Sequence, residues 1–154
     1  MDLILAEQKD IDTIEKIVFD TVMEIYPKFY PKGAVDYFIK HHDRSRIEAD
    51  VALRCVYYAV ADGLAVGTIT VKDNEINRFF VLPQFQGNGY GAELLKFAED
   101  KIFKTYDTIT LDSSLSGKLF YLKHGFEEYK FCPMPTESGD YLCYDTMIKK
   151  SDPD

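Results

Sequence analysis

The sequence predicts an α+β fold, a mixed and mostly antiparallel sheet of about six to seven strands with helices on its faces. Three observations support this prediction. The first third of the chain has helical periodicity, Asp62-Gly63 separates two β-rich runs, and the stretch Phe79–Gly91 passes from an apolar strand through glycines to a helix. The 154 residues contain no repeat or linker. We therefore expect a single domain over residues 1–150 and a polar tail over residues 151–154.

The N-terminal third predicts one short strand and two helices. Leu3–Leu5 is an apolar run, and apolar residues then recur at helical spacing from Ile14 to Ile25. Pro31 is well placed to open a second helix that continues to His42. The charged stretch Arg44–Asp50 is interpreted as the end of that helix and a loop.

The middle of the chain predicts an antiparallel meander that leads into a βαβ unit. Asp62-Gly63 is a strong hairpin signal, and Lys72-Asp73-Asn74 marks a second turn. The helix Ala92–Ile102 is amphipathic, and the strand Thr108–Asp112 after it is expected to be parallel to the strand before it. The meander has three β-rich runs: Val56–Ala61, Leu64–Val71 and Glu75–Leu82.

The C-terminal part predicts a short helix and two strands. Leu119–Leu122 lies on the helix, which His124-Gly125 closes. Phe126–Phe131 and Tyr141–Ile148 are the strands, joined by the loop Pro133–Asp140.

Charge and cysteine content limit the possible partners and location. The net charge of −8 argues against nucleic acid and anionic membrane, because both require basic surface. The odd number of cysteines, without metal spacing, and the absence of a leader pattern at Met1–Leu5 lead us to expect a cytoplasmic protein. His41 and His42 are adjacent on a predicted helix and point about 100° apart, so we expect no metal site there.

The glycines at alternate positions, Gly87, Gly89 and Gly91, predict an anion site. Backbone N–H groups at a strand-to-helix junction are unpaired, and the positive end of the helix dipole reinforces them. Such a junction is suited to the phosphate of a cofactor.

Two classes of phosphate site compete for this turn. A P-loop is excluded because no Gly-Lys-Ser/Thr follows the glycines. Gly87-x-Gly89-x-x-Ala92 does satisfy the dinucleotide fingerprint, and Asp112 follows about 20 residues later, where a ribose-binding carboxylate is expected. The antiparallel meander before the turn disfavours that fold, so an NAD-binding oxidoreductase is the less favoured alternative.

Two motifs resemble the GNAT acyl-CoA N-acyltransferases. Val81-x-Pro83-x-Phe85-Gln86-Gly87-x-Gly89-Tyr90-Gly91 is similar to that family's Gln/Arg-x-x-Gly-x-Gly/Ala signature. Phe120-Tyr121-Leu122-Lys123-His124-Gly125-Phe126 is similar to its later Tyr-x-x-x-Gly-Phe element. With the helical first third, the resemblance covers nearly the whole chain. It implies a three-layer α/β/α domain that moves an acetyl group from acetyl-CoA to a primary amine in a ternary complex, without a metal.

The resemblance also implies roles for residues along the motifs. The backbone N–H near Val81 would meet the thioester oxygen, where the strand splays. Ser114 stands where the family often has an Asn that holds the cofactor arm, and a serine hydroxyl would bond it more weakly. The turn would hold the pyrophosphate through residues Gln86, Gly87, Asn88, Gly89, Tyr90 and Gly91.

Catalysis needs a neutral amine and a stabilised thiolate. Glu75 resembles the glutamate that several family members use as the base, directly or through water, and Tyr121 would donate to the thiolate. The acceptor, a small molecule or a peptide, is expected near Tyr26, Tyr30 and Tyr37. Its identity, the acyl-chain preference and the choice between monomer and homodimer stay open. A non-catalytic acyl-CoA-binding or regulatory domain is the other alternative.

Overall fold

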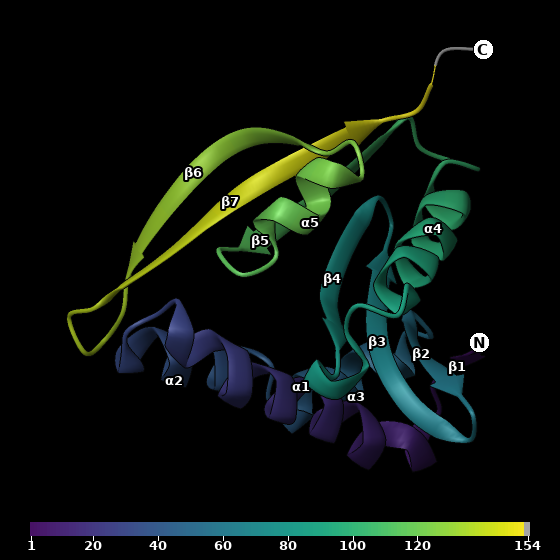
Figure 1. Ribbon diagram of the computed structural model, residues 1–154, viewed down its shortest axis with the longest axis horizontal. Helices are drawn as coiled ribbons and strands as arrows, with labels where there is room; N and C mark the ends of the chain where they lie inside the picture. The colour runs from purple at the N-terminus through teal and green to yellow at the C-terminus, as the bar shows by residue number, and fades with distance from the viewer. Residues whose placement is uncertain (153–154) are drawn as a thin grey trace.

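The computed structural model describes residues 1–152, and its centre is a mixed sheet (Figure 1). In spatial order the strands run β1-β2-β3-β4-β5-β7-β6, and every neighbouring pair is antiparallel except β4 and β5. The strands of the described residues are β1 (Asp2–Leu5), β2 (Val56–Ala61), β3 (Leu64–Lys72), β4 (Glu75–Val81), β5 (Thr108–Ser114), β6 (Glu127–Pro135) and β7 (Tyr141–Lys150).

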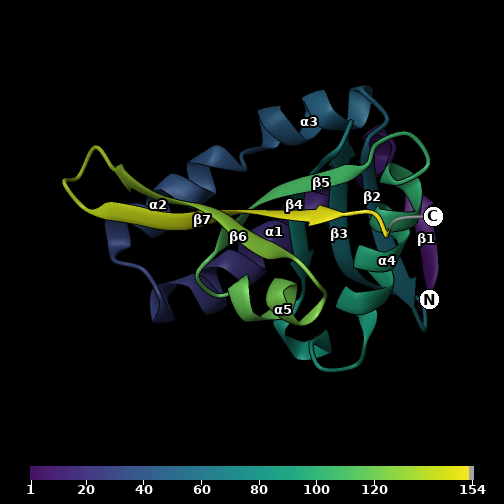
Figure 2. The ribbon, with the colours of Figure 1, turned by 90° about the horizontal axis from the view of Figure 1, so that it is seen from above.

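Helices cover both faces of this sheet, which confirms the predicted α+β, three-layer architecture (Figure 2). The first three helices lie on one face and the last two on the other. The helices are α1 (Ile11–Ile25), α2 (Lys32–His41), α3 (Arg44–Ala52), α4 (Tyr90–Ile102) and α5 (Lys118–Lys123), with short 3-10 turns η1 (Gln8–Asp10), η2 (Tyr26–Lys28) and η3 (Pro83–Phe85). Within residues 1–152, no helix has the length and apolar character needed to cross a bilayer.

The core is divided between the two faces of the sheet. On one face, Leu94 and Ile102 of α4 pack with Ile69 and Ile109 in the largest buried cluster. On the other, α1 and α2 pack on the far end of β4. The interior strand β3 is buried along most of its length because helices cover it on both sides.

The sheet opens between β4 and β5. Within the described chain these strands pair in parallel at Glu75–Thr110 and Ile76–Leu111, and they then diverge, as Figure 1 shows. A β-bulge in the pairing of β3 with β4 lies just beyond this point, and Arg78 there adopts a positive φ of 41°. Bulges bend and twist the strand that carries them. β4 therefore separates from β5 beyond Ile76, before it reaches Val81.

The prediction for Arg44–Asp50 is wrong, because the structure forms a separate helix there, α3. The Asp43 carboxylate accepts a hydrogen bond from the Arg46 N–H at 3.1 Å and caps its start. Ile47 and Val51, one helical turn apart, are buried against α1. The four-residue spacing of these two apolar residues is a sequence signal for a helix, but the charged residues around them obscured it.

The C-terminal strands are longer than predicted. β6 continues through Pro133 to Pro135, and β7 ends at Lys150. Prolines fit because β6 is the edge strand, where one side of the backbone needs no partner. β5 likewise extends past Asp112, which lies inside the strand rather than at its end. In the predicted polar tail, residues 153–154 lie outside the described residues.

Candidate active site

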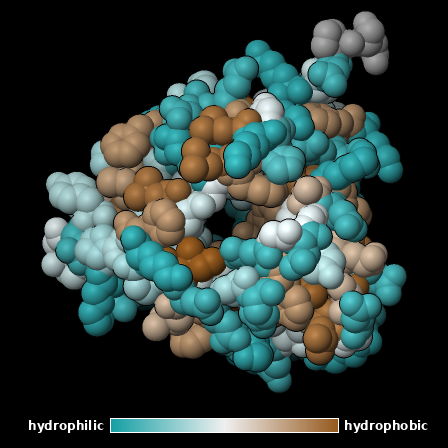
Figure 3. Space-filling model, in the orientation of Figure 1, coloured by the Kyte–Doolittle hydropathy of each residue, from teal (hydrophilic) through white to brown (hydrophobic). Residues whose placement is uncertain are grey.

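A cavity of about 830 Å³ occupies the opening between the two halves of the sheet. Ligand sites typically have this size. Its wall combines the glycine turn, the splayed part of β4, the end of β5, and residues of α2, α5 and β7. Figure 3 shows the opening near the centre of the molecule, with apolar residues around part of its rim.

The glycine turn faces this cavity at the start of α4. Gly87 and Gly89 adopt positive φ values of 80° and 86°, and Gly89 is the N-cap of α4. A Cβ added at either glycine would meet no protein atom within 4 Å among the described residues, so the turn is open on that side. Gln86, Gly87, Gly89 and Gly91 belong to the cavity wall. The unpaired N–H groups of the first turn of α4 thus lie beside an open space that could receive a phosphate.

Asn88 and Tyr90 support the turn rather than line the cavity. The Asn88 side-chain amide donates to the carbonyls of Phe85 and Gln86 at 3.0 and 3.3 Å. Tyr90, the first residue of α4, packs against the largest core cluster. Both residues therefore fix the shape of the turn.

The backbone of Val81 presents its polar groups to the cavity. The Leu82 N–H donates to the Val66 carbonyl at 2.9 Å, which makes Leu82 and Val66 a hydrogen-bonded pair. Because such pairs alternate along an antiparallel ladder, Val81 opposite Gly67 directs its N–H and C=O away from β3. The Gln86 side-chain amide donates to this carbonyl at 2.9 Å. The Val81 N–H faces the opening, as an oxyanion donor would.

Tyr121 of α5 is buried on the opposite wall. Its side chain is 9% exposed, and its ring packs with those of Phe79 and Phe126 at centroid distances of 6.2 and 5.6 Å. Burial, followed by the influence of Tyr26, raises the pKa of Tyr121, so its hydroxyl remains protonated at neutral pH. Gly117 provides space for this ring, because a Cβ there would lie 3.3 Å from Tyr121 Cε2.

Glu75 lies apart from these groups. It is exposed at the first residue of β4, and it lines a separate hollow of about 80 Å³ together with Asn77 and Asp112. At about 3.3 Å per residue, it is separated from Val81 by roughly 20 Å along the strand. Asn77 and Asp112 also line the main cavity, so the two spaces share a wall.

The three tyrosines predicted near the acceptor have different positions. Tyr26 and Tyr37 line the cavity, and the Tyr37 ring stacks on His41 at 5.6 Å. Tyr30, in contrast, is outside the wall formed by the described residues. Its hydroxyl donates to the Cys143 carbonyl at 2.9 Å and accepts from the Leu115 N–H at 2.7 Å, so it joins the connection between η2 and α2 to β7 and to the loop after β5.

Ser114 is the last residue of β5 and lines the cavity. Its Oγ lies 2.9 Å from the Ser116 Oγ. Burial raises the pKa of Tyr26, and the hydroxyls of Ser114 and Ser116 oppose this rise. The Tyr26 hydroxyl therefore lies close to the serine pair.

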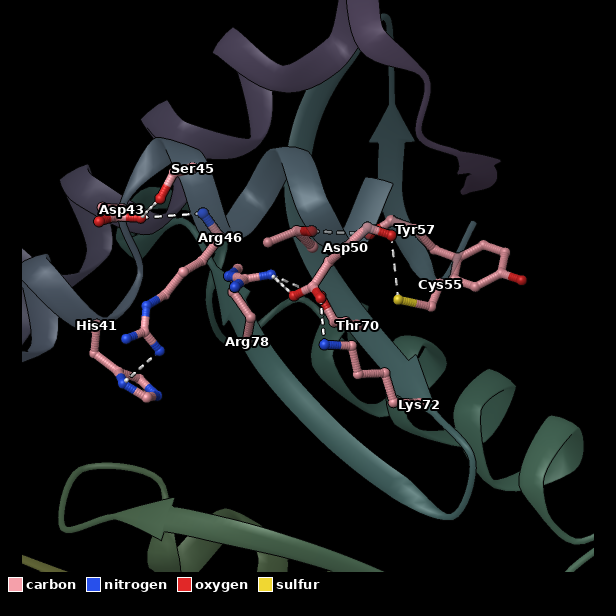
Figure 4. A network of polar contacts seen from close by, with 11 residues as sticks. His41, Asp43, Ser45, Arg46, Asp50, Cys55, Tyr57, Thr70, Lys72 and Arg78 are labelled. Carbon is pink, nitrogen blue, oxygen red and sulfur yellow. Dashed lines mark hydrogen bonds and ion pairs between the residues drawn. The ribbon is translucent and has the colours of Figure 1, made fainter. Parts of the chain in front are cut away.

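A group of basic residues in the wall was missed by sequence reasoning. Arg78, His41 and His42 line the cavity, and Figure 4 shows how Arg78 reaches from β4 to Asp50 on α3. An arginine inside an apolar strand was the available signal. The bulge that turns it inward depends on tertiary pairing. For metals, the described residues contain no group of three or more His, Cys, Asp or Glu side chains that could hold an ion.

Comparison with known protein families supports an assignment to a family. The family model described as "Acetyltransferase (GNAT) domain" matches residues 28–134 of this chain. A curated relative, "Uncharacterized N-acetyltransferase YafP" of Escherichia coli (strain K12), is 30% identical over 88 residues, 57% of this chain and 56% of that protein. The chain thus spans about half the length of this relative.

Solved structures show the same fold. A GCN5-related N-acetyltransferase from Rhodopseudomonas palustris has a TM-score of 0.88 at 19% identity, covering 97% of this chain and 95% of that one. The PaiA N-acetyltransferase of Thermoplasma acidophilum, in complex with coenzyme A, has a TM-score of 0.75 at 19% identity, covering 97% and 98%. The putative acetyltransferase YncA of Salmonella typhimurium, with its cofactor acetyl-CoA, has a TM-score of 0.73 at 17% identity, covering 100% and 98%.

The family model covers more than half of the chain, and both predicted motifs lie inside the matched residues. The chain therefore belongs to the GNAT acetyltransferase family of acyltransferases.

Proposed function

We propose that the protein transfers the acetyl group of acetyl-CoA to a primary amine, by direct attack in a ternary complex. One observation carries this proposal: the glycine turn, the Val81 backbone and Tyr121 open into the same cavity. PaiA and YncA, which share the fold, were solved with coenzyme A and acetyl-CoA. The same co-substrate would fit here.

The turn and β4 would hold the co-substrate. The N–H groups at the start of α4 would bind the pyrophosphate, with Gly87 and Gly89 allowing its close approach. Ser114 would hydrogen-bond the cofactor arm on the opposite side. The Val81 N–H would donate a hydrogen bond to the thioester oxygen.

The transfer forms a C–N bond and breaks a C–S bond. As the amine nitrogen attacks the thioester carbon, the Val81 N–H stabilises the negative oxygen, which typically contributes about 3 kcal/mol. When the tetrahedral intermediate collapses, the thiolate leaves and Tyr121 donates a hydrogen bond to it. Because burial raises the pKa of Tyr121, it acts mainly as a donor, and complete proton transfer to a thiolate would be unfavourable.

The attacking amine must lose a proton. Glu75 is too distant for direct contact, so we propose that water carries the proton past Asn77 and Asp112 to Glu75. Asp112 itself is a second carboxylate in the wall. The amine would enter on the side lined by Tyr26 and Tyr37, where aromatic rings favour an organic cation.

Thermal unfolding with ligands tests the class of co-substrate. Acetyl-CoA at 100 times its Kd should stabilise the protein by about 2.7 kcal/mol through mass action, while NAD should give no shift. Thiol release with a panel of amines and peptides then tests transfer. Stabilisation by NAD would contradict the proposal, and binding of acetyl-CoA without any turnover would favour the non-catalytic alternative.

The proton path is tested in the same assay. Glu75→Gln should lower kcat and change the pH–rate profile, and Asp112→Asn is the matched comparison because it removes the other carboxylate. If Glu75→Gln keeps both the wild-type turnover and the wild-type profile, Glu75 is not the base.

A further inference from the structure

Arg78 is a buried cation in the cavity wall. Its side chain is 6% exposed, and it reaches this position from the bulge in β4, where its φ is 41°. A positive φ is uncommon for a residue with a Cβ, and bulges often redirect a side chain next to a functional site. Arg78 thus belongs to the cavity wall, and its guanidinium pairs with Asp50 at the edge of that wall.

The charges around Arg78 do not balance. The Asp50 carboxylate accepts a hydrogen bond from Arg78 Nη1 at 2.7 Å and also pairs with the Lys72 ammonium, so one anion faces two cations (Figure 4). Burial raises the pKa of Asp50, but the contacts with Lys72 and Arg78 outweigh it and lower the pKa overall. Asp50 is therefore ionised at neutral pH, and the cluster keeps one excess positive charge.

The guanidinium also has unused donors. Its Nη1 donates to Asp50 and, at 3.4 Å, to Thr70 Oγ1. Its Nε is buried and has no partner among residues 1–152. An arginine carries five N–H donors in a planar arrangement that matches a carboxylate, and buried donors are normally paired. An anion in the cavity would compensate the excess positive charge of this cluster.

The neighbouring side chains favour such an anion. Arg46 adds a second guanidinium nearby, with its Nη1 3.4 Å from the His41 ring. Lys28 is a further cation in the wall. Against these cations, the lining among the described residues has one carboxylate, Asp112, which accepts a hydrogen bond from Thr146 Oγ1 at 2.7 Å.

From these contacts we propose that Arg78 forms an anion subsite on the acceptor side of the cavity, so that the preferred acceptor is an amine that also bears a carboxylate. This inference rests on the proposed acetyl transfer. Arg78 and Val81 lie on the same strand, at most about 10 Å apart at 3.3 Å per residue. The amine and the carboxylate are therefore separated by several bonds, with Tyr26 and Tyr37 packing along the connecting chain.

Matched acceptor pairs test the subsite. We would compare δ-aminovalerate with pentylamine, and lysine with cadaverine, by kcat/KM at saturating acetyl-CoA. The wild type should favour the carboxylated member by at least about tenfold, because the guanidinium pairs with the carboxylate. An aminoalkylphosphonate of the same length distinguishes a carboxylate site from a phosphate site, and a preference for the phosphonate would overturn the assignment to a carboxylate.

Variants assign the preference to Arg78. Arg78→Gln should remove most of the preference, measured as the ratio of kcat/KM values within each acceptor pair, under conditions where the variant is folded. Arg44→Gln is the matched control: it removes the same charge from an exposed site on α3, where Arg44 pairs with Asp12 and Glu15. Arg78→Lys keeps the charge but loses the planar donors, and should keep only part of the preference.

Equal kcat/KM values for the members of both pairs would overturn the subsite and leave the proposed function intact. This comparison uses the wild type and does not depend on the folding of a variant. If no amine is acetylated, the proposed function fails, and calorimetric titration of δ-aminovalerate into the protein–coenzyme A complex decides the subsite. Binding that Arg78→Gln abolishes would support it, and absence of binding would overturn it.

Discussion

At the scale of single residues, Tyr30 and Tyr121 show how one side-chain type serves two purposes. Both are almost fully buried. The Tyr30 hydroxyl is fixed between the Cys143 carbonyl and the Leu115 N–H, whereas Tyr121 belongs to the cavity wall. Burial raises the pKa of both phenols. The hydrogen bonds of Tyr30 therefore identify its hydroxyl as structural, whereas the position of Tyr121 in the cavity wall makes its hydroxyl a candidate for catalysis.

Phenylalanine substitutions should separate these roles. Tyr121→Phe should lower kcat by tenfold or more, on the order of 1.4 kcal/mol, with little change in stability, because its hydroxyl would act in the reaction. Tyr30→Phe should instead lower the free energy of unfolding by about 1–2 kcal/mol, because it removes two hydrogen bonds. Turnover assays and urea unfolding measure the two effects. Full kcat in Tyr121→Phe would refute its catalytic role.

At the scale of elements, the glycine turn and the Asp62-Gly63 hairpin have similar backbones but different surroundings. Gly63 and Gly89 have φ values of 77° and 86°, and a Cβ at either would meet no described atom within 4 Å. Gly89 lines the cavity at the start of α4, and Gly63 lies in a hairpin between β2 and β3. A side chain at either position strains the backbone, but only at Gly89 would it also obstruct a ligand.

The comparison of Gly89→Val with Gly63→Val therefore isolates binding. Both variants should lose about 1–3 kcal/mol of stability through backbone strain. Gly89→Val should also raise the Kd for acetyl-CoA sharply, while Gly63→Val should leave it near the wild-type value. Calorimetry under conditions where both variants are folded measures this. Unaltered binding in Gly89→Val would contradict the pyrophosphate assignment.

At the scale of the whole molecule, the opening between the two halves of the sheet has basic side chains in its wall, where they are partly shielded from solvent. His42 lies at the end of α2 in the cavity wall, and burial together with the Arg78 charge lowers its pKa to about 3. The unfolded chain has an ordinary histidine pKa near 6.5. Below about pH 6.5 His42 is protonated in the unfolded state but stays neutral in the folded state. The free energy of unfolding therefore falls as the pH falls toward 3.

This linkage predicts an acid-sensitive fold. Between pH 7 and pH 5, His42 alone should reduce the free energy of unfolding by up to about 2 kcal/mol. His42→Gln should remove that part of the slope, and His41→Gln should change it less, because His41 is the more exposed of the two residues. Urea unfolding at several pH values measures the slopes, and equal slopes for wild type and His42→Gln would contradict the assigned cause.

Much of the fold follows from local sequence signals. The Asp62-Gly63 hairpin, the glycine turn and the amphipathic helix α4 form as predicted, because turn chemistry and helical periodicity act over a few residues. Helix α3 was missed because charged residues surround Ile47 and Val51, which are buried only after α1 packs on them. The length of β6 was missed because proline is tolerated there only at a sheet edge, and edges are set by strand order.

The sequence by itself determined the glycine turn, the two motifs and the family, because these depend on residue types at fixed spacing. Tertiary structure decided what shares a cavity. It brought Tyr121 and the Val81 N–H to opposite walls, kept Glu75 at the far end of β4, and turned Arg78 inward through a bulge. The positions of these groups depend on how β4 and β5 pair and then diverge, which is a long-range arrangement that no local pattern encodes.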